Sequence, residues 1–203
     1  MTADAGTSGR PKQTAEWERK RREILDVAAD VFFTSGFQKG TTKEIAERVG
    51  LSQSTLYHYV GSKEDLMGEI AEQVDRDFTQ ALDDAEALGG PPRDRLDRII
   101  DAFVGALVLN RRTFGVYWKE FRSIPPELAK KIAADEQSFA RRVEAVVGEV
   151  QAAGQLPADH PTRLLSQGIL GMMSWTHWWY RSDEFTAEQV AAAYKALVGL
   201  SPG

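Results

Sequence analysis

Apolar residues recur every three to four positions along most of the chain, and no segment alternates apolar and polar residues as a half-buried strand would. The first such stretch begins at Ala15, places Ile24, Ala28 and Phe32 on one face, and ends at Gly36. Glycines, prolines and capping residues separate the later stretches, which predict helices over 62–88, 93–110, 113–122, 126–153, 161–181 and 187–200. The pattern therefore predicts an all-α protein of about nine helices.

Residues 40–61 read GTTKEIAERVGLSQSTLYHYVG and predict two short helices joined by a tight turn. A capping box opens the first helix, and Gly50 ends it. Two helices that meet at a steep angle need a small residue where they touch, which Ala46 supplies, and an apolar residue on the second helix, which is Leu56. This spacing predicts a helix-turn-helix over 41–59, and the alternative is an ordinary pair of packed helices.

A helix-turn-helix places its second helix in the major groove of DNA, with the amino-terminal side chains against the base edges. Gln53 has the amide geometry for bidentate pairing with adenine, and Lys63, in the first turn of the next helix, can hold a backbone phosphate. Ser54 and Tyr57 have structural alternatives, since the first can favour helix initiation and the second can pack on the helical frame. The predicted DNA-binding side chains are Thr42, Gln53, Ser54, Thr55, Tyr57, His58 and Lys63.

The net charge of the chain is -5, but the charge is unevenly distributed. Residues 1–63 carry ten Lys or Arg against eight Asp or Glu, whereas residues 64–203 carry fifteen against twenty-two. This asymmetry is compatible with a small DNA-reading module joined to a larger acidic body. Residues 1–13 are rich in Gly, Ser and Thr and contain Arg10 and Lys12, so we expect a flexible basic arm, either a simple tail or a segment that reaches a DNA groove.

The chain contains no cysteine, which excludes disulfides, thiolate metal sites and thiol nucleophiles. Its three histidines, His58, His160 and His177, are far apart, and no phosphate-binding glycine loop or nucleophile elbow is present. We therefore expect a protein that is not an enzyme and that holds no metal and no cofactor. No apolar run long enough for a membrane span or a secretory signal occurs, which predicts a cytoplasmic protein without a membrane partner.

The segment GTTKEIAERVGLSQSTLYHYVGSKEDL closely resembles, without gaps, the amino-terminal signature of the TetR family of one-component transcriptional repressors. The resemblance covers about residues 22–66, with Ser54 where glycine is common and Tyr59 where phenylalanine is common. It implies a chain of three parts, which are a flexible basic arm over 1–13, a DNA-binding domain over 14–62 and a ligand-binding and dimerisation domain over 63–203.

In the TetR family, the two carboxy-terminal helices of each subunit usually form a four-helix dimer interface. The resemblance therefore implies a homodimer on a palindromic operator, with half-sites roughly 34 to 36 Å apart or a multiple of that distance. Glycines on the penultimate helix would let another helix approach closely, although the same apolar stripes are compatible with an intramolecular core. The implied interface residues are Leu164, Gly168, Gly171, Trp179, Tyr194 and Leu197.

The segment MMSWTHWWYR gathers aromatic residues and methionines that are expected to divide between a core, an interface and a cavity wall. With the following RSDEFTAEQV, it resembles TetR-type regulators of fatty-acid or steroid breakdown, which sense acyl-CoA thioesters, although Asp183 and Glu184 stand where Pro and Gly are frequent. The CoA anion would need cations, for which the candidates, equally compatible with surface charges, are Arg111, Arg112 and Arg122. The implied cavity residues are Phe103, Leu107, Trp118, Phe121, Met172 and Trp175.

These expectations combine into a DNA-binding transcriptional regulator, a homodimeric repressor that a small hydrophobic ligand such as an acyl-CoA releases from its palindromic operator. The sequence leaves open an activator, or a regulator that answers a different ligand class, such as a drug or an aromatic acid, or a protein partner. An α-helical enzyme or metal-binding protein with a coincidental helix-turn-helix is a further alternative, but the sequence contains none of the motifs that it would need.

Overall fold

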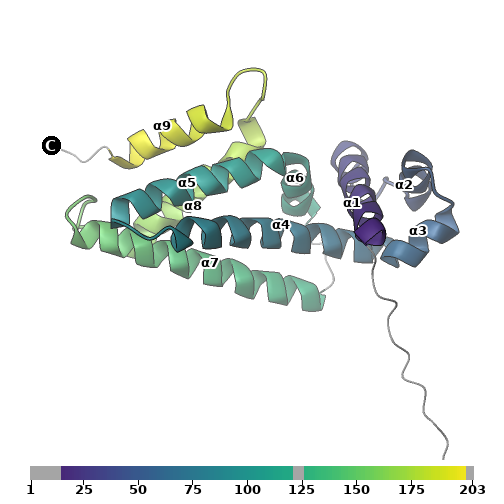
Figure 1. The fold of residues 1–203 in the computed structure, drawn as a ribbon, viewed down its shortest axis with the longest axis horizontal. Helices are drawn as coiled ribbons and strands as arrows, with labels where there is room; N and C mark the ends of the chain where they lie inside the picture. The colour runs from purple at the N-terminus through teal and green to yellow at the C-terminus, as the bar shows by residue number, and fades with distance from the viewer. Residues whose placement is uncertain (1–14, 121–125, 200–203) are drawn as a thin grey trace, which may run out of the picture.

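The computed structural model describes residues 15–120 and 126–199, which form helices and no strand (Figure 1). The all-α fold predicted from the apolar pattern is confirmed. The arm predicted over 1–13, like Phe121 and Arg122, lies outside the described residues. The helices of the described residues are α1 (Ala15–Ser35), α2 (Thr42–Val49), α3 (Gln53–Val60), α4 (Lys63–Ala87), α5 (Pro92–Leu109), α6 (Arg111–Glu120), α7 (Pro126–Ala152), α8 (Thr162–Trp179) and α9 (Ala187–Gly199).

The helices after the turn region begin close to their predicted starts, and the differences have local causes. α6 begins at Arg111, earlier than predicted, because only Asn110 separates it from α5 and the Phe114 N–H already donates to the Asn110 carbonyl oxygen at 2.8 Å. α8 ends at Trp179, earlier than predicted, because Tyr180 has an extended backbone with ψ 135°. Both corrections concern helix ends, where periodicity carries little information.

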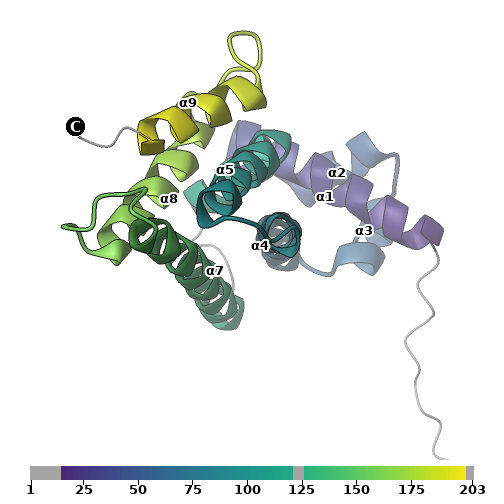
Figure 2. The same cartoon turned by 60° about the vertical axis from the view of Figure 1, so that its left-hand side comes forward.

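Helices α1, α2 and α3 lie together at one end of the molecule, and α4 leads from them into the rest of the chain (Figures 1 and 2). α1 contacts α2, α3 and α4, and its Ile24, Ala28 and Phe32 are completely buried. The loop before α2 lies directly on α1, since a Cβ atom on Gly40 would be only 2.9 Å from the Phe32 ring. The apolar face predicted for the first helix therefore forms the core of this head, which we define as α1 to α3.

The other end is a bundle of α4, α5, α7 and α8, with α9 packed against α5 (Figure 2). α5 is central, because it contacts each of these helices and buries Leu96, Ile100 and Leu107 completely. α6 lies between the bundle and the head, in contact with α1 and α4 (Figure 1). None of the described helices combines the length and the apolar content that a membrane span requires. The head and the bundle are thus joined through α4 and α6.

Gly50 is a position where the backbone of the head favours glycine, since its φ of 73° is left-handed and ends α2. We expect Gly50→Ala to lower the free energy of unfolding by about 1–2 kcal/mol, because a Cβ atom is strained in this region even though no atom lies within 4 Å. Gly50→Asn should cost less, because asparagine tolerates the left-handed conformation. Denaturant unfolding of the three proteins measures both losses, and a costlier asparagine would contradict the conformational explanation.

Candidate nucleic-acid interface and adjoining cavity

α2 and α3 meet through a tight turn whose geometry follows from its capping residues. The Gly50 N–H points to carbonyl oxygens in the last turn of α2, and the Ser52 side chain begins α3 by accepting a hydrogen bond from the Thr55 N–H at 3.1 Å. Ala46 and Leu56 are buried, 2% and 0% exposed. The small residue, the turn glycine and the apolar residue therefore have the arrangement that a helix-turn-helix requires.

One face of α3 is open to solvent and carries most of the predicted DNA-binding side chains. They lie within the first two turns of α3, the part of such a helix that meets base edges in a major groove. The exposed side chains are Gln53, Ser54, Thr55, Tyr57 and His58. The sequence-predicted set is thus brought together on one element, with Thr42 and Lys63 beside it.

Thr42 lies beneath this face and is 8% exposed. Its Oγ1 accepts a hydrogen bond from Gln53 Nε2 at 2.9 Å and lies 3.0 Å from Tyr57 Oη. These contacts fix two exposed side chains of α3 relative to the first turn of α2. Thr42 is therefore placed to hold Gln53 and Tyr57, while its own hydroxyl has little access to solvent.

Lys63 begins α4, and its ammonium group turns back toward the head. Nζ donates to the Gln38 carbonyl oxygen at 3.3 Å and lies 4.5 Å from the centroid of the Phe37 ring. An ammonium group has three donors, so these contacts leave donors for a phosphate at the edge of the head.

Two side chains of α1 that the sequence did not single out border the same part of the head. Lys20 Nζ donates to the Val49 carbonyl oxygen at 3.0 Å, at the carboxyl end of α2, where a cation is favoured by the helix dipole. Trp17 stacks on Tyr59 with 5.4 Å between ring centroids. These partners are far apart in the sequence and meet only in the folded chain, so no local signal identifies them.

An ion pair network joins α6 to the head through Asp30 of α1. The Asp30 carboxylate accepts hydrogen bonds from Arg48 of α2, at 2.6 Å, and from Arg112 of α6. The hydrogen bond from Arg48, followed by the charge of Arg112, lowers the pKa of Asp30, so this carboxylate is charged at neutral pH. The Asp30 carboxylate therefore links α1, α2 and α6.

Close packing joins α6 to the head at two further points. Gly115 lies against the Phe33 ring, because a Cβ atom at Gly115 would be 2.9 Å from Phe33 Cε2. At the end of α6, Glu120 accepts a hydrogen bond from the backbone N–H of Phe37 at 3.2 Å. The start, the middle and the end of α6 are thus each attached to α1 or to the loop after it.

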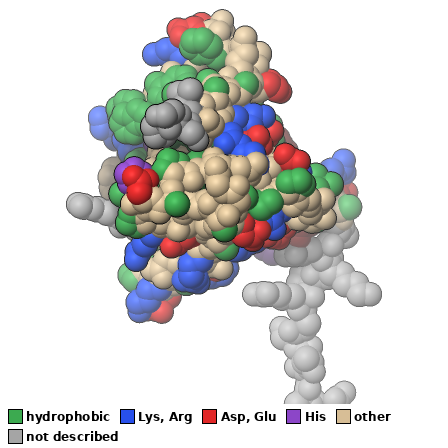
Figure 3. Space-filling view, turned by 90° about the vertical axis from the view of Figure 1, so that its left-hand side faces the viewer, with side chains coloured by type: hydrophobic (Ala, Val, Ile, Leu, Met, Phe, Trp, Pro, Cys, Tyr) green, Lys and Arg blue, Asp and Glu red, His purple; other side chains and the backbone are tan. Residues whose placement is uncertain are grey.

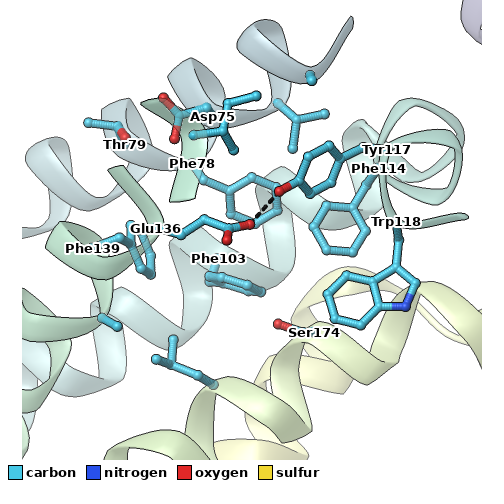
Figure 4. A pocket seen from close by; sticks show the side chains of 15 residues that line it. Asp75, Phe78, Thr79, Phe103, Phe114, Tyr117, Trp118, Glu136, Phe139 and Ser174 are labelled. Atoms are coloured by element: carbon cyan, nitrogen blue, oxygen red, sulfur yellow. Dashed lines mark hydrogen bonds between the residues drawn. The ribbon is translucent and has the colours of Figure 1, made fainter. Parts of the chain in front are cut away.

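A cavity of about 240 Å³ lies between α4, α5, α6, α7 and α8 (Figure 4). Its wall is largely aromatic, and the Phe78 ring lies 4.6 Å from that of Phe103 and 5.4 Å from that of Phe114. The described lining residues are Ala71, Val74, Asp75, Phe78, Thr79, Phe103, Phe114, Tyr117, Trp118, Ile132, Glu136, Phe139, Ala140, Leu170 and Ser174. α6 contributes Phe114, Tyr117 and Trp118, so the helix attached to the head also forms one wall of the cavity.

The aromatic wall is interrupted by carboxylates and hydroxyls. The Tyr117 hydroxyl donates to the Glu136 carboxylate across the cavity (Figure 4). Burial and then this hydrogen bond raise the pKa of Tyr117, which keeps the phenol protonated. Burial and then the neighbouring charge of Asp135 raise the pKa of Asp75. The polar atoms that face the interior therefore come from side chains that are acidic or neutral.

Two residues predicted to form the cavity, Phe103 and Trp118, line it. Leu107 is completely buried one turn further along α5 and is not among the lining residues. Phe103 and Leu107 share a face of α5, but the cavity extends only to the level of Phe103.

α8 presents a different face to the cavity from the one that the sequence suggested. Leu170 and Ser174, four residues apart, line the cavity, whereas Met172 is half-buried against the core. Trp175 follows Ser174 by one residue, about 100° around the helix. Its side chain is therefore directed away, is 58% exposed, and stacks on Trp178 with 6.0 Å between centroids.

α8 and α9 carry an apolar surface that no described residue covers. Figure 3, which faces the end of the molecule opposite the head, shows apolar side chains gathered on the flank where Figure 2 places α8 and α9. Gly168 and Gly171 lie in open space, because nothing comes within 4 Å of a Cβ atom built on either. More than half of each side chain is exposed for Leu164, Trp175, Trp178 and Leu197.

Of the residues implied at a dimer interface, Tyr194 packs inside its own chain, whereas Trp179 is partly exposed. Tyr194 is 8% exposed, and its hydroxyl lies 2.7 Å from Thr176 Oγ1, so it packs between α9 and α8 of its own chain. Trp179 is 37% exposed and makes an edge contact with Phe185. The open surface therefore includes Leu164, Gly168, Gly171 and Leu197 but leaves out Tyr194.

Comparisons with known proteins agree with this geometry. The family model described as bacterial regulatory proteins of the tetR family matches residues 24–70, and the model described as the tetracyclin repressor-like C-terminal domain matches residues 89–199. The fatty acid metabolism regulator protein of Bacillus subtilis is 22% identical over 166 residues, which cover 81% of this chain and 86% of the relative.

Solved structures have the same fold. The TetR family transcriptional regulator PfmR from Thermus thermophilus superposes with a TM-score of 0.81 and 27% identity, over 88% of this chain and 99% of that one. AibR in complex with isovaleryl coenzyme A and operator DNA superposes with a TM-score of 0.77 and 22% identity, over 89% of this chain and 98% of that one. Because one family model alone matches more than half of its residues, the chain belongs to the TetR family of transcriptional regulators, which are not enzymes, and has an amino-terminal DNA-binding domain and a carboxy-terminal ligand-binding domain.

Proposed function

We propose that the chain is a homodimeric repressor whose heads bind a palindromic operator and leave it when a small molecule with an apolar body occupies the cavity. In this proposal, residues 14–62 form the DNA-binding domain, which follows an arm over 1–13. Residues 63–203 form the ligand-binding and dimerisation domain. The observation that carries the proposal is the position of α6, between the cavity and the head.

α6 supports a route from a ligand to the head, because it borders the cavity and contacts α1. Phe114, Tyr117 and Trp118 form a wall of the cavity, while Arg112 and Gly115 of the same helix contact α1. A ligand can shift an equilibrium only by binding one state better than the other. A ligand that fits the cavity at one position of α6 therefore favours one position of the head.

The exposed face of α3 supports docking in the major groove. Thr42 holds the amide of Gln53 and the hydroxyl of Tyr57, so these groups meet DNA with part of their conformational entropy already lost. One such helix contacts only a few base pairs, and a two-fold dimer doubles the number of bases read. The operator that matches such a dimer is palindromic.

The open apolar surface of α8 and α9 supports the dimer. Large contiguous apolar patches are rare on monomeric proteins and typical of protein interfaces. Gly168 and Gly171, with open space above them, would let a helix of the partner subunit approach closely. In the proposed dimer, α8 and α9 of both subunits form a four-helix interface.

The chemical class of the effector is supported by the cavity and by one relative. AibR binds isovaleryl coenzyme A, and the aromatic wall would accept the acyl chain of such a thioester. The CoA anion would then lie outside the cavity, near cations. Arg112 already pairs with Asp30, and Arg111 has a buried Nε atom without a partner among the described residues. An acyl-CoA is therefore one candidate for the effector.

Electrophoretic mobility shift with the full chain and the intergenic DNA beside its own gene tests the proposed repressor. We expect a discrete complex at low salt that weakens steeply as salt rises, because each phosphate contact releases counterions. The absence of any complex at low salt would contradict DNA binding.

Two substitutions in the head should separate base reading from phosphate binding. Gln53→Ala should weaken the operator complex by about 1–3 kcal/mol and leave unrelated DNA nearly unchanged. Lys63→Gln should weaken both DNAs about equally and reduce the salt dependence. Lys195→Gln, on α9 and paired with Asp101, is the matched control and should change neither. If both head variants bound like the parent, the proposed docking would be wrong.

The dimer is tested by a charge on the open surface. Leu164 is 64% exposed, and we expect Leu164→Asp to give monomers, because an interface buries the new carboxylate without a partner. Leu88, 72% exposed after α4, provides the control, and Leu88→Asp should remain dimeric. Sedimentation equilibrium measures the mass of each protein. A monomeric parent, or a Leu164→Asp protein that stays dimeric, would argue against this interface.

A further inference from the structure

The charged side chains among the described residues that line the cavity are all carboxylates. Asp75 and Glu136 line it, and no Lys, Arg or His is among the described lining residues. Glu136 accepts a hydrogen bond from the Tyr117 hydroxyl, whereas Asp75 makes no hydrogen bond or ion pair with any described residue. The interior of the cavity therefore combines a mainly apolar surface with two carboxylates and no fixed cation among the described residues.

An open groove on α4 and α7 continues the same charge outward, since Asp75, Thr79 and Phe139 line both the groove and the cavity. The other carboxylates of the groove are Asp77, Asp83 and Asp135. The four carboxylates of the groove outnumber its two arginines, of which Arg142 pairs with Asp83 and Glu86, and Arg76 with Glu72, a carboxylate that Lys131 shares. A molecule that approaches the cavity along this groove meets a negative potential, which concentrates cations.

The surroundings of Asp75 in the cavity disfavour its charge. Burial is the largest cause that raises the pKa of Asp75, and the charges of Asp135 and Glu136 raise it further, against the opposite effects of Lys131 and Arg76. Burial and like charges destabilise the ionised form of a carboxylate, and a positive group placed beside it stabilises that form. A ligand cation would supply that group.

The aromatic wall favours the same kind of ligand. Six lining side chains carry aromatic rings. The centroid of the Phe78 ring lies 4.6 Å from that of Phe103 and 5.4 Å from that of Phe114. The faces of such rings attract cations, most strongly when water is excluded. A bare metal ion is a poorer match, because the described residues contain no group of three carboxylate or histidine ligands that could hold one.

We propose that the effector of this regulator is an organic cation, with an ammonium or amidinium group between Asp75 and Glu136 and a compact apolar or aromatic body against Phe78, Phe103 and Phe114. The inference rests on the proposed function, in which the cavity is the effector site. It differs from the acyl-CoA candidate, because a free carboxylate or a CoA phosphate at this position would face two carboxylates of the same sign.

A pair of probes of equal shape isolates the charge. Benzyltrimethylammonium and neopentylbenzene differ only in a quaternary nitrogen in place of a quaternary carbon, and isothermal titration of the full chain measures the affinity of each. We expect the cation to bind at least about tenfold more tightly than the hydrocarbon. Asp75→Asn and Glu136→Gln should each remove most of that difference and leave the hydrocarbon affinity unchanged.

Asp84→Asn is the matched control, since Asp84 lies on α4, is exposed, and accepts a hydrogen bond from Gln80 outside the cavity. It should bind both probes like the parent. Thermal unfolding without ligand checks that each variant is folded, and neutralising Asp75 should not lower the midpoint, because burial and neighbouring carboxylates disfavour its charge. Equal affinity of the two probes for the parent, or tighter binding of isovaleryl coenzyme A than of the cation to the parent, would overturn the proposal.

Mobility shift with the same ligands separates this inference from the proposed function. If the cation binds with the expected variant effects but leaves the operator complex intact, the cation site stands and release by cavity ligands fails. If isovaleryl coenzyme A dissolves the complex and the cation neither binds nor dissolves it, the ligand-released repressor stands and the cation site falls. A protein that forms no operator complex but binds the cation would overturn only the proposed function.

Discussion

The contact between α6 and α1 is the constraint on which the rest of the molecule depends. Arg112 pairs with Asp30 at the start of α6, Gly115 admits the Phe33 ring in its middle, and Glu120 holds the loop after α1 at its end. Because these attachments are spread along the helix, α6 cannot slide or tilt against α1 without losing an ion pair, a hydrogen bond or a ring contact. Interiors packed in this way respond as connected bodies, so a displacement of α6 reaches the head.

The size of the signal sets a requirement on the cavity. Moving a two-state equilibrium from 1:99 to 99:1 needs a difference in binding free energy of about 5.5 kcal/mol between the states. Apolar burial contributes about 25 cal/mol per Å², so roughly 220 Å² of contact made in only one state would suffice. Trp118, on the α6 wall, is 57% exposed and offers area that a ligand can cover. Contacts made equally in both positions of α6 add affinity but no signal.

The head was predictable from the sequence because its signals are local, whereas the cavity is a product of packing. Capping residues, Gly50 and the spacing of Ala46 and Leu56 all act within about twenty residues, and the structure retains each of them. Which face of α8 meets α5 and α7 is decided by helices far apart in the chain, so the sequence places Trp175 at a cavity that it does not line in the structure. The sequence does not identify Asp75 and Glu136 as cavity residues for the same reason, since a charged residue on a predicted helix ordinarily indicates a solvent-facing position.

The hydrogen bond between Tyr117 and Glu136 connects the charge of the cavity to the motion of the head. Tyr117 belongs to α6 and Glu136 to α7, so this bond ties the helix that contacts α1 to the bundle. In the proposed complex, a cation beside Glu136 shares the carboxylate with the Tyr117 hydroxyl, while its apolar body presses on Phe114 of the same helix. The charge loosens the attachment of α6 on one side, and the body displaces it from the other. In this proposal both effects act on one short helix, through which a ligand far from α3 would govern whether the head meets DNA.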